Sequence, residues 1–175
     1  MVILGIDPGL AGMGFGAVAC GAAPSISLLK CGAIRTSPEH HISQRLFQIH
    51  KDLGQLMETV KPDVVAVEDI FSLVRYPKAG MMLGGVMAVI YLAVVPSGIA
   101  VIEVTPREVK NALAAYGAAT KAQVREATKR ALGIGQLKSF HAADALAVAL
   151  TVYYRSYRGK DDILPGRGSQ KNIRG

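Results

Sequence analysis

The chain has 175 residues and a formal net charge of +7, with half of its residues hydrophobic and only 19% charged. This composition, with 19 glycines and 8 prolines, excludes a wholly disordered, collagen-like or coiled-coil protein, and the length suits one domain with a substantial core. Two cysteines are too few for a disulfide framework or a zinc ribbon, so we expect Cys20 and Cys31 to be apolar packing groups in a reducing compartment rather than a cross-strand disulfide.

The first part of the chain predicts three strands, a helix and a fourth strand. Residues 2–7 (VILGID) form a buried strand, and residues 13–20 and 25–35 form two further strands joined by a turn. Apolar residues three or four positions apart predict an amphipathic helix over 39–60. A short buried strand follows at 63–68. The N-terminal region is therefore a meander of strands followed by an α–β unit.

The second part predicts one strand among four helices. These elements are a helix at 79–95, a strand at 99–104, a helix from Thr105-Pro106 to Gly117, a helix from Thr120 to Gly133 and a helix at 140–157. Thr105 and Thr120 are suitable N-caps, and Thr120 with Gln123 matches a capping box. Residues 158–175 have the composition of a mobile basic tail. We therefore expect one domain over 1–157, an α/β fold with a mixed five-stranded sheet and helices on its faces.

One uncharged segment is long enough to span a bilayer. Residues 79–102 contain no charge, and Gly80 and Gly84 match a pattern of associating membrane helices. Pro96-Ser97-Gly98 divides the segment into a helix and a short strand, which is typical of buried elements in a soluble protein. We expect the helix to pack on all sides, partly against another subunit.

The positive charge is concentrated in two regions. Residues 155–175 carry six Lys or Arg against two Asp, and residues 105–138 carry seven Lys or Arg against two Glu. The remainder is slightly acidic. This distribution indicates a polyanionic partner, although a basic surface on its own is also typical of ordinary solubility.

Three carboxylates stand beside apolar runs. Asp7 and Glu68 each end a predicted buried strand, and Asp144 begins the most apolar part of the last helix. Any one of them alone is best interpreted as an exposed group at the end of its element. Together, beside a basic region, they favour a divalent metal site. His141 lies three residues before Asp144, on the same helix face, where a metal ligand, a general base and a surface group are all open.

The N-terminal glycines allow a different interpretation. Gly5, Gly9, Gly12, Gly14 and Gly16 surround Asp7 and are compatible with a phosphate-binding turn of a small phosphotransferase. They do not match the P-loop pattern, and no predicted helix follows them. Glycines continuing into a strand suit a tight hairpin or the close approach of another backbone.

Five motifs resemble the RuvC family of Holliday-junction resolvases. They are ILGIDPGLAGMGFG (3–16), VVAVEDIF (64–71), PREVKNAL (106–113), TKAQVREATKRALG (120–133) and HAADALAVAL (141–150). The resemblance implies an RNase H-like fold, a homodimer and two Mg²⁺ or Mn²⁺ ions in each active site. It also implies symmetric nicking of two strands of like polarity at a four-way DNA junction, leaving ligatable 5′-phosphate ends.

The resemblance also assigns residues. Asp7, Glu68 and Asp144 match three acidic metal ligands of the family, and His141 stands at the fourth position, where some members have Asp. Lys121, with Lys110, matches lysines that approach the scissile phosphate.

A loop after the fourth strand matches the family's DNA-contacting loop. Phe71 corresponds to an aromatic residue that stacks on unpaired bases at the junction centre, although a core position is equally open. Arg75, Tyr76 and Lys78 follow in the same loop and are candidates for phosphate contacts. Arg107 and Arg125 are weaker candidates for such contacts and are interpreted first as plain solvated helix charges.

The resulting hypothesis is a metal-dependent, structure-selective DNA endonuclease active in recombination and repair. Two alternatives remain: a catalytically silent module that binds branched DNA, and the small phosphotransferase. A branch-migration helicase is a further partner implied by the resemblance. No secretory signal is visible, so we expect a cytoplasmic protein with no membrane partner.

Overall fold

The computed structural model describes residues 1–21, 25–70, 77–114, 117–137 and 139–157. Its elements are β1 (Val2–Asp7), β2 (Gly12–Cys20), β3 (Ile26–Arg35), α1 (Ile42–Val60), β4 (Val64–Glu68), α2 (Pro77–Val94), the 3₁₀ turn η2 (Val95–Ser97), β5 (Ala100–Val104), α3 (Pro106–Ala114), α4 (Lys121–Leu132) and α5 (Phe140–Tyr157). The predicted order of strands and helices is confirmed. The predicted tail at 158–175 lies outside the described residues, so the domain boundary stays a prediction.

The five strands form one mixed sheet in the order β3-β2-β1-β4-β5. β1, β2 and β3 are antiparallel neighbours, as the predicted meander requires, whereas β1, β4 and β5 run parallel. Parallel strands end at the same edge of a sheet, so the C-terminal ends of β1 and β4 lie side by side. This edge carries two of the predicted site residues.

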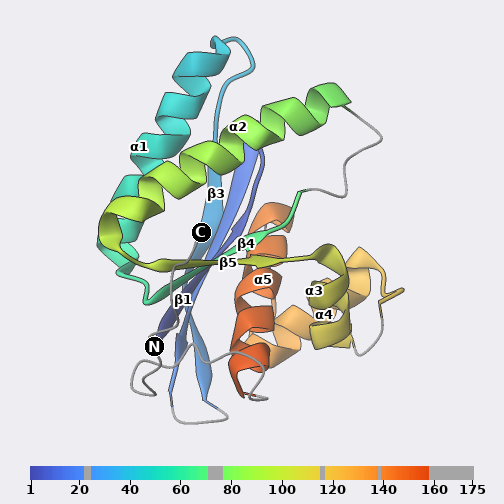
Figure 1. The fold of residues 1–175 in the computed structure, drawn as a ribbon. Coiled ribbons are helices and arrows are strands. Elements are labelled where there is room, and N and C mark those ends of the chain that lie inside the picture. The colour runs from blue at the N-terminus through green and yellow to red at the C-terminus, as the bar shows by residue number, and fades with distance from the viewer. Residues whose placement is uncertain (22–24, 71–76, 115–116, 138, 158–175) are drawn as a thin grey trace, which may run out of the picture.

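Helices cover both faces of the sheet, as Figure 1 shows, with α1 and α2 on one face and α3, α4 and α5 on the other. Successive side chains of β1 point to opposite faces of the sheet and so contribute to both layers of the core. Ile3 faces the α5 side, Leu4 and Ile6 face the α1 side, and all three are fully buried. The α/β class with helices on both faces is confirmed.

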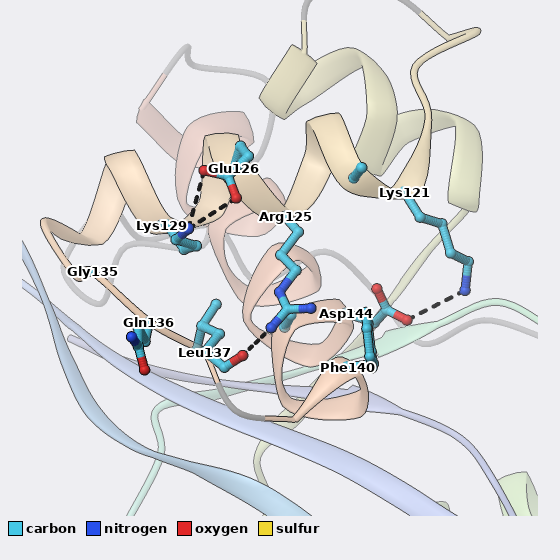
Figure 2. Close-up of a pocket in the computed structure, with 11 residues that line it drawn as sticks. Lys121, Arg125, Glu126, Lys129, Gly135, Gln136, Leu137, Phe140 and Asp144 are labelled. Atoms are coloured by element: carbon cyan, nitrogen blue, oxygen red, sulfur yellow. Dashed lines mark hydrogen bonds and ion pairs between the residues drawn. The ribbon is translucent and has the colours of Figure 1, made fainter.

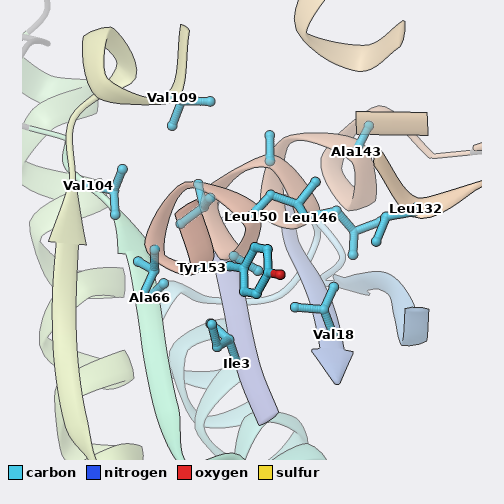
Figure 3. Close-up of a cluster of buried hydrophobic side chains, with 14 of the residues drawn as sticks. Ile3, Val18, Ala66, Val104, Val109, Leu132, Ala143, Leu146, Leu150 and Tyr153 are labelled. Atoms are coloured by element: carbon cyan, nitrogen blue, oxygen red, sulfur yellow. The ribbon is translucent and has the colours of Figure 1, made fainter. Parts of the chain in front are cut away.

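The core under α5 is built from small and branched side chains. Leu146 and Leu150 of α5 pack with Ile3 and Val18 of the sheet, as Figure 3 shows. Most of α5 between Ala142 and Tyr153 is buried, including a run of alanines. A helix of small residues allows close approach to the strands, and this approach places the first turn of α5 at the edge where β1 ends.

Helix ends follow local chemistry. Thr120 caps α4 with the predicted capping box, and Gly133 ends the helix in a left-handed conformation. α1 begins at Ile42, three residues later than predicted, because the His41 side chain accepts the backbone N–H of Ser43 and acts as the cap. Histidine is an uncommon cap, so the sequence pattern does not mark this boundary.

The expectation that the apolar helix packs on all sides is wrong within this chain. One face of α2 packs on α1 and the sheet through Val86, Ile90 and Val94, whereas Met81 is 80% exposed and Leu92 is 64% exposed. Residues 79–97 are long and apolar enough to cross a membrane by length and composition, and 22% of the window tested is buried inside the domain. The packing on α1 and the sheet favours the soluble domain.

Both cysteines are free thiols, so the alternative of a cross-strand disulfide does not hold. Burial raises the pKa of the Cys20 thiol to about 11, which makes it an unreactive packing group.

Candidate active site

Two carboxylates meet at the C-terminal edge of the parallel strands. The register pairs Ile6 of β1 with Val67 of β4, so Asp7 and Glu68 are the next residues on adjacent strands. Their carboxyl groups are close enough to share a hydrogen bond. Both residues follow fully buried hydrophobic stretches, which holds their backbones in fixed positions.

Glycines allow α5 to bring two further residues to this edge. A Cβ atom on Gly5 would lie 2.8 Å from the backbone N of Ala149, and one on Gly14 would lie 2.6 Å from the carbonyl carbon of His141. Real Cβ atoms do not approach backbone this closely, so α5 rests directly on the backbones of β1 and β2. The glycines predicted to allow close backbone approach do so, and the phosphate-binding turn loses its support.

Five predicted site residues, four possible metal ligands and Lys121, therefore lie near one another. Nδ1 of His141 lies 3.1 Å from Oδ2 of Asp7, and Nζ of Lys121 lies 3.4 Å from Oδ2 of Asp144. The Asp7 side chain is 16% exposed and that of Asp144 is 30% exposed. The carboxylates are thus largely withdrawn from water while remaining accessible from one side.

The electrostatics of the cluster are those of crowded negative charge. Burial raises the pKa of the Asp7 carboxyl; the hydrogen bond with His141 opposes this rise and the charge of Asp144 adds to it. Burial also raises the pKa of Glu68 to about 7, with further contributions from the charges of Asp7 and Asp144. A bound cation would relieve this repulsion.

Lys121 occupies a position that helix stability alone does not favour. It is the first residue of α4, where the helix dipole and the free N–H groups disfavour a cation by about 0.3–1 kcal/mol. The charge of Asp144 raises the pKa of Lys121, which keeps the ammonium protonated. A cation held at the unfavourable end of a helix beside three carboxylates is suited to binding phosphate.

The donor set fits a hard divalent cation in its chemistry. Three carboxylates and one imidazole converge on one edge, and oxygen ligands of this kind suit Mg²⁺ or Mn²⁺. Within the described residues, no three His, Cys, Asp or Glu side chains are spaced closely enough to hold a metal ion as they stand. The hydrogen bond between His141 and Asp7 and the ion pair between Lys121 and Asp144 engage two of the carboxylates instead.

The remaining predicted residues are distributed differently. Phe71, Arg75 and Tyr76 lie outside the described residues, as does the side chain of Lys78. Lys110 is half-buried on α3, and among the ion pairs of the described residues it is not joined to the site carboxylates.

Arg125 corrects one interpretation, because it is not a plain solvated charge. Its guanidinium lies 4.4 Å from the ring centre of Phe140 and donates to the carbonyl oxygen of Leu137. Figure 2 shows Arg125, Phe140 and Asp144 lining one pocket between α4 and the start of α5. Phe140 was not among the predicted site residues, because no local pattern marks it and its partner Arg125 lies on another helix.

Comparison with known proteins identifies the family. The model of the RuvC family, described as crossover junction endodeoxyribonuclease RuvC, matches residues 3–152. The chain belongs to the RuvC family. Among its curated relatives, RuvC of Syntrophomonas wolfei is 40% identical over 159 residues, covering 90% of this chain and 91% of the relative. RuvC of Natranaerobius thermophilus is 34% identical, covering 90% of this chain and 97% of the relative.

Solved structures give the same assignment. The structure of Thermus thermophilus RuvC in complex with Holliday junction substrate aligns with a TM-score of 0.85 at 33% identity, covering 91% of this chain and 97% of that chain. The yeast mitochondrial Holliday junction resolvase aligns with a TM-score of 0.63 at 12% identity, over 90% of this chain and 81% of that chain, which shows the shared fold alone. The fold is thus the RNase H-like fold of RuvC, and nucleases of this family depend on divalent metal ions.

Proposed function

We propose that this protein resolves Holliday junctions by nicking two strands of like polarity symmetrically, leaving 5′-phosphate ends that can be ligated. The proposal is carried by the convergence of Asp7, Glu68, His141 and Asp144 at one accessible edge of a RuvC-type sheet. It is further supported by the relatives named crossover junction endodeoxyribonuclease. The products suit recombination and DNA repair.

In this proposal Asp7, Glu68 and Asp144 hold two Mg²⁺ or Mn²⁺ ions, with His141 as a further ligand or as the base that accepts a proton from the attacking water. When bound, such ions activate water and stabilise the charge on the leaving oxygen of a phosphodiester. The protein contributes a partly dry edge and fixed carboxylates. Asp7 and Asp144, which contact His141 and Lys121 in the structure, would be among the residues that hold the ions.

The basic residues bind the DNA strand. Lys121 is 89% exposed beside Asp144 and is placed to meet the scissile phosphate. We assign weaker phosphate contacts to Lys110, Arg75 and Lys78, and stacking on unpaired bases at the junction centre to Phe71. These four assignments rest on the match with the family's motifs.

The exposed face of α2 is our candidate for a homodimer contact. The exposed positions Met81, Gly84, Ala88 and Leu92 of α2 follow each other at intervals of three or four, which places them on one helix face. Val95, the first residue of η2, is exposed three positions after Leu92. Two such faces related by a two-fold axis bury apolar side chains around the small residues Gly84 and Ala88. A dimer presents two active sites to the two strands that symmetric nicking requires.

Cellular context follows from the same proposal. We place the protein in the cytoplasm, acting on four-way junctions that a branch-migration helicase complex moves. The basic segment 155–175, with six Lys or Arg, adds to the attraction for DNA.

A nicking assay on a synthetic immobile four-way junction tests the proposal. The wild-type protein should nick two opposing strands in Mg²⁺ and none in EDTA, while Asp7→Asn should bind the junction with unchanged affinity and not nick it. Nicking by Asp7→Asn at the wild-type rate would remove the metal site. Tight junction binding by the wild type without nicking in Mg²⁺ or Mn²⁺ would instead identify a silent DNA-binding module.

A further inference from the structure

A basic pocket adjoins the candidate metal site and has no assigned role. It has a volume of about 620 Å³ and lies between α4, the loop before α5 and the first turn of α5, with Asp144 at one end (Figure 2). Lys121, Arg125 and Lys129 line it together with Glu126 and Asp144. Lys121 is ion-paired with Asp144 and Lys129 with Glu126, so the excess positive charge of the lining comes from Arg125. The size is that of ordinary small-ligand sites, and the charge favours a phosphate-bearing ligand.

The pocket is lined by an aromatic side chain that remains largely exposed to solvent. Phe140 is 72% exposed although it is a large apolar side chain. Arg125 lies over one face of the ring at 4.4 Å from its centre, and its hydrogen bond to the carbonyl oxygen of Leu137 fixes the guanidinium there. The exposed area of Phe140 therefore belongs to the other face and the edge of the ring. A ring with one face covered by Arg125 and the other face exposed can stack on a second planar group.

The ring of Phe140 lies within one to two nucleotides of the proposed cleavage site. Phe140 and Asp144 are four positions apart on α5, so their Cβ atoms are about 5–6 Å apart on the same helix face. Successive nucleotides of a stacked strand advance by about 3.4 Å. A strand whose scissile phosphate faces Asp144 therefore passes Phe140 within its next two nucleotides.

We propose that this pocket binds a nucleotide one or two positions from the scissile phosphate, with its unpaired base stacked on the open face of Phe140 and its phosphate in the positive field of Arg125. The inference rests on the proposed function and adds a subsite to it. Paired bases inside a linear duplex are already stacked on both faces, whereas bases beside a crossover are available for stacking. Phe140 thus contributes to the preference for a junction over linear DNA.

The chemistry of the pocket also suits a free mononucleotide, and the experiment must separate the two sources. Junctions are prepared with intact nucleotides or with one abasic nucleotide at each of the first two positions on either side of the scissile phosphate. Single-turnover nicking rates in Mg²⁺ are measured for the wild type and for Phe140→Ala. The stacking energy of one base corresponds to a nicking rate that is lower by about 5- to 150-fold when the ring is removed.

On the intact junction Phe140→Ala should therefore nick about 5- to 150-fold more slowly, and Phe140→Trp should nick at close to the wild-type rate. Removing the stacked base should slow the wild type by a similar factor, and Phe140→Ala should cause no further loss on that abasic junction. Phe47→Ala is the matched control, because Phe47 is 69% exposed on α1, which packs on the opposite face of the sheet, and it should change neither rate.

The subsite would be overturned if Phe140→Ala slowed nicking of the abasic junction as strongly as it slows nicking of the intact junction. It would also be overturned if Phe140→Ala nicked the intact junction at the wild-type rate. Competitive inhibition of nicking by deoxynucleoside monophosphate that disappears in Phe140→Ala, with no abasic effect, would assign the pocket to free nucleotide and also overturn it. Failure of the wild type to nick any intact junction would be a failure of the proposed function itself, so the two failures are distinguishable.

Discussion

Glu68 carries a carboxyl group whose pKa is raised to about 7 by burial and by the charges of Asp7 and Asp144. In metal-free protein this group keeps its proton in the folded state up to about pH 7, whereas the unfolded chain loses it near the ordinary value of 4.5. The resulting stabilisation is complete below pH 4.5 and disappears as the pH rises through 7. Glu68→Gln, which cannot ionise, should thus be more stable than wild type above pH 7 by about 3 kcal/mol.

Urea unfolding in EDTA at pH 4.5 and pH 8 measures this difference, which should vanish at the lower pH. Glu126→Gln is the control of opposite sign. The hydrogen bond from Lys129 lowers the pKa of the Glu126 carboxyl, so Glu126→Gln should be less stable than wild type near neutral pH. Parallel pH profiles for wild type and Glu68→Gln would show that Glu68 is not crowded by the other carboxylates.

Replacing Lys121 should change the nicking rate far more than the free energy of unfolding. Its charge is unfavourable at the start of α4 and is offset by an exposed ion pair with Asp144, so Lys121→Ala should change the free energy of unfolding by less than about 1 kcal/mol. The loss of a cation beside the scissile phosphate should slow single-turnover nicking by about 10²–10³-fold. Lys51→Ala, an exposed lysine on α1, should alter neither quantity. An unchanged rate in Lys121→Ala at saturating enzyme would remove this lysine from the reaction.

At the scale of elements, the close contact between α5 and the sheet sets the site geometry. A Cβ at Gly14 would meet the carbonyl carbon of His141 at 2.6 Å, and backbone cannot move aside as a side-chain tip can. Gly14→Ala should therefore destabilise the protein by about 1–3 kcal/mol and slow nicking through displacement of His141. Gly54→Ala on α1 has open space around its Cβ and should instead stabilise by about 0.5–1 kcal/mol. Urea denaturation of both variants tests the pair; equal effects would mean that α5 tolerates displacement.

The strands, the helices and the site carboxylates could be predicted because each is marked by residues that lie close together in the sequence. Strand 2–7 ends where Asp7 follows buried residues, and the Thr120 capping box sits within four residues of sequence. The pairing of Arg125 with Phe140 was not predictable, since it depends on where the loop through Leu137 places its carbonyl group. The exposed face of α2 was missed for a related reason. Its hydrophobicity is nearly uniform around the helix, so the sequence does not tell which side the sheet and α1 cover.

At the scale of the whole molecule, the exposed apolar stripe on α2 connects assembly with activity. Ala88 lies at its centre and is exposed, and a charged side chain there would be buried unpaired in a two-fold contact. Ala88→Arg should therefore be monomeric by sedimentation at concentrations where wild type is dimeric, and it should lose paired nicking of opposing strands. Leu29→Arg replaces another exposed apolar side chain, 51% exposed on β3 at one edge of the sheet, and should remain dimeric. A dimeric Ala88→Arg that nicks both strands at the wild-type rate would exclude α2 as the contact and require another face to align the two active sites.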